Sequence, residues 1–211
     1  MSAERNADHV SGVLFVLAGL VSGLITAGLT WPAGRLGGFV LGGVFGMILA
    51  ASLAIGGVLR SVARAVGLTV ISAVAYYLAI AAAAAVELNS PWVKWSMSSP
   101  SSVSPLSLFA GGAVGGLILL TSSLLLARGN IGTRAFARAA LIGSAVGGIL
   151  AMIGWSLGPT LGMAIWSGVH AIALTAPTET FQNALGETSH RFSLFVIWQT
   201  GMSSLLGIML N

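Results

Sequence analysis

Long apolar segments separated by short polar or proline-containing turns make up almost the whole chain. They cover about residues 10–30, 38–59, 65–86, 108–127, 139–157, 160–176 and 192–210. Each is near the length of about 20 residues that an α-helix needs to cross a hydrocarbon core. The pattern therefore predicts an all-α, polytopic integral membrane bundle with seven transmembrane helices, forming a single domain over residues 1–211.

The segment 139–178 allows two helix counts. It contains no charged residue, it is too long for one crossing, and Gly158-Pro159 marks a turn near its middle. We expect helices at 139–157 and 160–176. The alternative is a six-helix protein in which 160–176 does not cross.

The longest polar stretch, residues 87–107, contains three prolines, two tryptophans and many serines. Such a segment cannot cross lipid with its backbone unpaired, so we expect a loop outside the hydrocarbon core. A second polar stretch, 178–191, is expected to form a short interfacial helix.

Two parts of the chain resemble each other and suggest an internal repeat. Shifting residues 39–52 by 70 positions gives seven identities, and Arg60-x-x-Ala63-Arg64-Ala65 matches Arg134-x-x-Ala137-Arg138-Ala139. If the units 38–86 and 108–157 are a true repeat, they form parallel hairpins related by an axis along the membrane normal. The alternative is coincidence in a chain rich in glycine, alanine and leucine.

Composition and charge agree with a membrane protein. The chain is 56% hydrophobic and 7% charged, against roughly 25% charged in soluble domains. The basic residues are dispersed between apolar segments, which argues against nucleic-acid binding. With the N-terminus in the cytoplasm, the seven-helix topology places seven arginines inside and only Arg35 and Lys94 outside. We expect a bacterial-type inner (plasma) membrane.

Small residues spaced four apart recur in several segments and predict close helix packing. The pairs Gly42/Gly46, Gly112/Gly116 and Gly143/Gly147 are examples. Such faces could also form a subunit interface, so membrane lipids, a second copy of the chain or other membrane subunits are the expected partners.

Arginine pairs four residues apart lie at two helix ends. Arg60 with Arg64, and Arg134 with Arg138, each share one face. These four arginines are candidate contacts for anionic lipid headgroups, and simple topogenic charge is the alternative.

Few side chains within the apolar segments offer chemistry. His170 is the one titratable group that we place within a crossing, so it is the candidate cofactor ligand, for haem or chlorophyll, or else a partner in a helix–helix hydrogen bond. Gln199, Thr200 and Ser203 form a polar stripe on the last segment, and Ser122 lies in the fourth. Such residues line a pathway or contact a neighbouring helix. No metal site and no further cofactor is expected.

The carboxylates all fall in tails and loops, so ion-coupled transport and aspartyl or metalloprotease chemistry lack their usual groups. We therefore expect a non-enzymatic protein. The first hypothesis is a small permease or channel-like protein for a neutral or weakly charged solute. The alternative is an accessory or assembly subunit of a larger membrane complex, in contact with lipid or a cofactor.

Overall fold

The computed structural model describes residues 2–29, 37–59, 61–89, 103–161, 163–164 and 179–210. Within these residues the chain is helical apart from short turns, and they contain no strand. The helices are α1 (Ser2–Leu29), α2 (Gly37–Ile55), α3 (Val62–Asn89), α5 (Pro105–Arg128), α6 (Thr133–Ser156) and α8 (Glu179–Leu210). The all-α prediction is confirmed.

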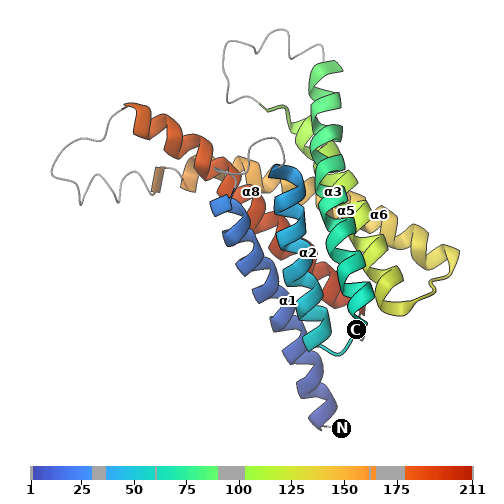
Figure 1. The fold of residues 1–211 in the computed structure, drawn as a ribbon. Helices are drawn as coiled ribbons and strands as arrows, with labels where there is room; N and C mark the ends of the chain where they lie inside the picture. The colour runs from blue at the N-terminus through green and yellow to red at the C-terminus, as the bar shows by residue number, and fades with distance from the viewer. Residues whose placement is uncertain are drawn as a thin grey trace.

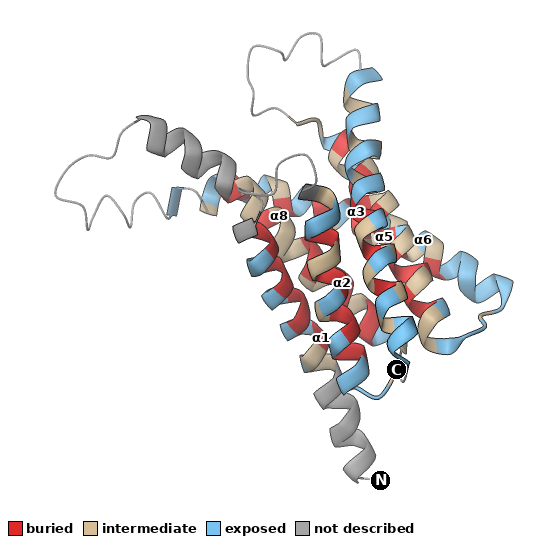
Figure 2. Ribbon diagram, viewed as in Figure 1, coloured by how far each residue is buried: buried red, intermediate tan, exposed pale blue. Residues whose placement is uncertain are grey.

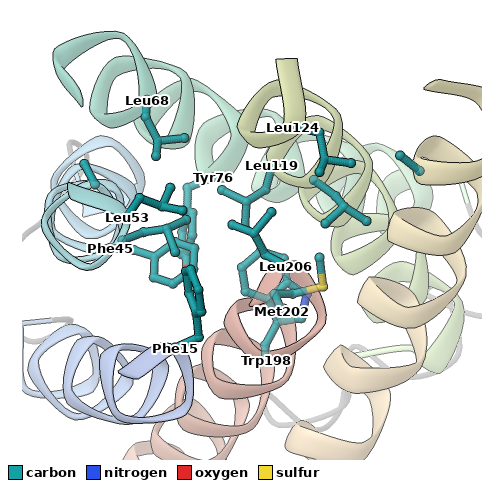
Figure 3. Close-up of a cluster of buried hydrophobic side chains, with 14 of the residues drawn as sticks. Phe15, Phe45, Leu53, Leu68, Tyr76, Leu119, Leu124, Trp198, Met202 and Leu206 are labelled. Carbon is teal, nitrogen blue, oxygen red and sulfur yellow. The ribbon is translucent and has the colours of Figure 1, made fainter. Parts of the chain in front are cut away.

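The six described helices form a closed ring in the order α1, α2, α3, α5, α6, α8 (Figure 1). Each helix packs against the next, and α8 packs against α1, so the first and last helices close the ring. Neighbours are antiparallel throughout. Large side chains from several helices meet in the centre of the ring (Figure 3).

We call the end of the ring that holds the start of α1 and the end of α8 the terminal end. Figure 1 shows both chain termini there. We call the opposite end, where α3 ends and α5 begins, the far end. The contacts between α1 and α8 place these two ends together, because Gly19 of α1 lies beside Thr200 and Gly207 of α8 lies beside Phe15.

The seven-helix count is not confirmed. In the seven-helix topology the last helix runs from the terminal end to the far end. In the structure α8 runs the other way, because Gly154 packs on Leu194 and Gly158 on His190 near its start. The described helices therefore make six passes, as in the six-helix alternative. Most of the expected helix 160–176 lies outside the described residues.

Glycines make the closest contacts in three antiparallel helix pairs. In α2–α3, a methyl group on Gly42 would lie 2.8 Å from the Ala73 Cα. In α5–α6, methyl groups on Gly112 and Gly116 would overlap the carbonyl oxygens of Gly147 and Gly143. In α1–α8, Gly23 meets the Val196 backbone. Small residues at these positions let the helix backbones approach closely, as the sequence predicted.

The distribution of side chains suits a hydrocarbon environment. Large apolar residues are exposed along the outside of α1, α3 and α6, whereas several serines, two threonines and a glutamine are buried inside (Figure 2). Five described helical segments are long and apolar enough to cross a membrane: 38–55, 62–89, 105–128, 133–161 and 189–210. The apolar part of α1, Gly12–Ala27, is shorter.

Helix ends are fixed by specific hydrogen bonds. Ser104 caps α5 by accepting a bond from the Ser107 N–H (3.1 Å), and Pro105 occupies the first helical turn. The Ser104 N–H also donates to the Glu87 carboxylate at 3.2 Å, which joins the far ends of α3 and α5. We expected 87–107 to be a loop throughout, but the helices extend three residues into it at each side.

Candidate functional site

A hydrogen-bonded cluster of Thr26, Tyr76 and Gln199 lies in the centre of the ring; we call it the cross-ring cluster. The Gln199 Nε2 donates to the Thr26 Oγ1 at 3.1 Å and to the Tyr76 hydroxyl oxygen. Because α3 and α8 are not neighbours in the ring, the Tyr76–Gln199 bond bridges it from side to side. The Gln199 side chain is fully buried (0% exposed).

The side-chain oxygen of Gln199 has no hydrogen-bond partner. This oxygen, Oε1, is buried without a hydrogen bond. Turning the amide over would let Oε1 accept from the two hydroxyls, but it would leave Nε2 unpartnered instead. A buried polar group without a partner costs about 1–3 kcal/mol, more in an apolar surrounding. The site therefore keeps an open hydrogen-bonding position at the centre of the ring.

Further hydroxyls lie one helical turn from this cluster, toward the terminal end. Ser72 precedes Tyr76 by four residues on α3, and Ser203 follows Gln199 by four on α8, so each shares a face with its partner. The Oγ atoms of both serines are buried without a partner, as is the Thr200 Oγ1. Ser22, one turn before Thr26 on α1, donates to the Gly19 carbonyl.

Three aromatic side chains pack around Tyr76 of the cross-ring cluster: Phe45, Phe195 and Trp198. The Tyr76 ring packs edge-on against Trp198 (centroids 5.5 Å apart, 87°) and nearly parallel to Phe195 (6.4 Å, 18°). Phe45 contacts both Tyr76 and Trp198. The Trp198 Nε1 donates to the Gly147 carbonyl oxygen at 3.1 Å, which fixes the indole against α6.

A cavity of about 160 Å³ lies against these rings. Side chains and backbone of four helices line it: Tyr76, Ala79, Ile80, Ala83, Leu108, Gly111, Gly112, Ala151, Leu194, Phe195 and Trp198. The lining extends along α3 from Tyr76 to Ala83, about 10 Å at 1.5 Å per residue. The cavity therefore occupies the far half of the ring, with the aromatic rings at its deep end.

The terminal half of the ring centre is filled. The buried residues there are Phe15, Leu49, Leu53, Leu68, Leu119, Met202 and Leu206. Figure 3 shows Phe15, Leu53, Leu119, Met202 and Leu206 gathered between the helices. The open and filled halves meet at the cross-ring cluster, near the middle of the helices.

The structure brings together only part of the predicted polar set. Gln199, Thr200 and Ser203 lie on the buried side of α8, as a pathway or helix contact requires. Ser122, on α5, is half-buried and lies outside the cross-ring cluster. The candidate cofactor ligand His170 falls outside the described residues. His190 stacks on Trp155 and donates from Nδ1 to the Trp155 carbonyl oxygen at 2.8 Å.

The arginines of the two predicted pairs also differ in their surroundings. Arg134 and Arg138 are exposed in the first turns of α6. Arg64 donates to the Leu126 carbonyl at 3.2 Å, near the end of α5, so protein atoms already hold it. Arg60 lies outside the described residues. Arg128, which was not among the candidates, donates to the Met209 carbonyl at 2.9 Å.

Sequence reasoning missed Thr26 and Tyr76 as members of the site. Tyr76 did carry a usable signal, because a tyrosine in the middle of an apolar segment lies far from the membrane interface that tyrosines favour. Thr26 carried none, since hydroxyls in apolar helices usually bond to their own backbone.

The described residues thus form a ring of six helices with a polar cluster at its centre, and five of these helices are long and apolar enough to cross a membrane. No protein-family model, curated protein or solved structure matches the chain.

Proposed function

We propose that this is an integral membrane protein with six crossings and with its terminal end in the cytoplasm. The charge distribution supports this orientation: Arg64, Arg128, Arg134 and Arg138 lie at the terminal end, whereas Arg191 lies near the far end. An excess of arginine on the cytoplasmic side is the usual determinant of orientation. A bacterial-type inner membrane fits this topology.

We further propose that the protein is a small permease or channel-like protein for a neutral solute. One observation carries this proposal: the unpartnered half of the Gln199 amide lies at the ring centre, between the open cavity and the filled half. A purely structural amide would gain by satisfying all its hydrogen bonds. An uncharged solute suits the site, because no charged side chain lines the cavity in the part of the chain that the structure describes.

The proposed path passes from the cavity, past Tyr76 and Gln199, to the hydroxyls of Ser72 and Ser203. In the structure the aromatic rings and the filled half close this path. Opening requires the Tyr76–Gln199 bond to break, and the solute would then take over the hydrogen bonds of the amide. Tyr76 and Gln199 are thus the gating and binding groups of the proposal.

A second candidate is an accessory subunit of a membrane complex, and the filled terminal half favours it. A ring whose centre is packed with leucine, methionine and phenylalanine serves as a rigid structural element without any passage.

Flux measurements distinguish the two candidates. Purified protein in liposomes is challenged with glycerol, sorbitol and benzamide, and entry is followed by stopped-flow light scattering. The permease proposal expects faster entry of at least one solute than in empty liposomes, and loss of the difference in Gln199→Leu. Ser122→Ala, a change outside the cluster, should leave flux unchanged. Absence of flux, together with recovery in a fixed-stoichiometry native complex, would support the subunit instead.

A further inference from the structure

The cavity in the far half of the ring has an apolar wall, and this wall favours an apolar ligand. Among the described residues that line the cavity, two side chains carry polar atoms, Tyr76 and Trp198, and both atoms take part in hydrogen bonds. The Tyr76 hydroxyl oxygen accepts from Gln199, and the Trp198 N–H donates to the Gly147 carbonyl. The other side chains of the lining are aliphatic or phenyl groups. Water needs two to four polar partners to occupy a site, so this cavity disfavours it.

The cavity is only partly enclosed, and Ile80, which is 54% exposed, lies in its α3 wall. The Ile80 Cδ1 lies close to Gly38 of α2, and the neighbouring Ala79 lies against Gly111 of α5, so this wall stands where α2, α3 and α5 meet.

The volume and the deep end of the cavity specify the shape of the ligand. An enclosed apolar cavity of about 150 Å³ in another protein accepts a single benzene molecule, so a volume of this size is sufficient for one ring. Here the volume is about 160 Å³, and the deep end is made by Tyr76, Phe195 and Trp198. Aromatic rings prefer edge-to-face or offset partners at centroid distances of about 4.5–7 Å. A bound ring would extend the aromatic cluster in that geometry.

We infer that the cavity is a binding site for one uncharged aromatic ring, with the rest of the ligand extending toward the far end. The inference rests on the proposed function only in assigning that ring to the transported solute. Binding of the ring depends on the cavity alone, so it is measured without any transport.

The test uses fluorobenzene as the isolated ring and ¹⁹F NMR of the full chain in nanodiscs. The expected result is a saturable bound resonance, separate from that of lipid-dissolved probe, with one site per chain. Two filling variants from different helices, Leu108→Phe and Ala83→Leu, should each weaken binding by at least about tenfold. The matched controls are Leu106→Phe and Ala84→Leu, which make the same changes at exposed positions on the same helices and should leave binding within about twofold.

Absence of a bound resonance in the wild type would overturn the inference, whether an acyl chain or water fills the cavity. Equal loss of binding in filling and control variants would overturn it as well. The outcome is separable from that of the flux assay. Binding of the ring without flux would support this site and contradict the permease proposal. Flux of glycerol without binding of the ring would support the permease and contradict this site.

Discussion

The helix pairs α2–α3 and α5–α6 meet at corresponding positions, but the residues at those contacts differ. Adding 70 to a position in α2 and 74 to one in α3 converts the Gly42–Ala73 contact into Gly112–Gly147, and Gly46–Thr69 into Gly116–Gly143. These are the offsets at which the two parts of the sequence match, and the repeat itself stays a prediction.

The difference between the pairs lies in the second helix. In α5–α6, glycine meets glycine, and the backbones pack directly on each other. In α3, the equivalent face carries Thr69, Ser72 and Tyr76, so α2 packs against larger and more polar side chains. One pair therefore supplies close packing, and the other supplies the tyrosine of the cross-ring cluster.

The largest effect is expected in the tighter pair. Gly116→Ala would place a methyl group on the Gly143 carbonyl oxygen, where only backbone could move away. We expect a loss of at least about 3 kcal/mol in the free energy of unfolding, measured by SDS titration in mixed micelles. Gly43→Ala is the control, since a methyl group there meets nothing within 4 Å. It should be neutral or stabilise by up to about 1 kcal/mol.

A smaller loss is expected at the corresponding position of the other pair. In Gly42→Ala the new methyl group would lie 2.6 Å from the Ser72 carbonyl oxygen and 2.8 Å from the Tyr76 Cβ. We expect the free energy of unfolding to fall by about 1–2 kcal/mol, because this helix contact has glycine on one side only and α2 can shift outward. A cost equal to that of Gly116→Ala in the same titration would contradict the distinction between the pairs.

The polar cluster should matter more for function than for stability. Gln199→Leu removes the hydrogen bonds to Thr26 and Tyr76 but also removes an unpartnered Oε1. These contributions oppose each other, so the free energy of unfolding should change by no more than about 1 kcal/mol, while solute flux is lost. Tyr76→Phe keeps the ring and removes one acceptor, with an expected cost of about 1 kcal/mol. A loss above about 3 kcal/mol in Gln199→Leu would identify the amide as a structural group.

The smallest effect is expected at the terminal end, where α3 meets α5. Arg64→Ala removes the bond from the guanidinium to the Leu126 carbonyl, which is exposed, so we expect about 0.5–1 kcal/mol. Arg138→Ala, on an exposed turn of α6, should leave stability unchanged. If Arg138→Ala costs more, a partner outside the described contacts holds that arginine. Liposome binding at varied anionic-lipid content then tests whether the headgroups do so.

Helix existence and small-residue packing were predictable because both are local. Apolar length defined the segments, and the four-residue glycine spacing placed Gly42, Gly112 and Gly147 on contact faces. Helix ends were less predictable, since polar caps such as Ser104 set them and hydrophobicity does not. The direction of α8 was not predictable, because an apolar segment packs equally well in either direction until its neighbours are known. The meeting of Thr26, Tyr76 and Gln199 depends on that direction, so the site could not be assembled from sequence.

The closure of the ring by its first and last helices has a consequence for biogenesis. The hydrogen bond between Thr26 and Gln199 joins residues 173 positions apart. The α1–α8 contact therefore forms only after α8 has been synthesised, whereas α2 is available to α1 much earlier. Until then Gly19 and Gly23 of α1 lack the backbone of Thr200 and Val196, on which they pack in the folded protein. Loss of α8 would remove these contacts and leave α1 with its packing on α2.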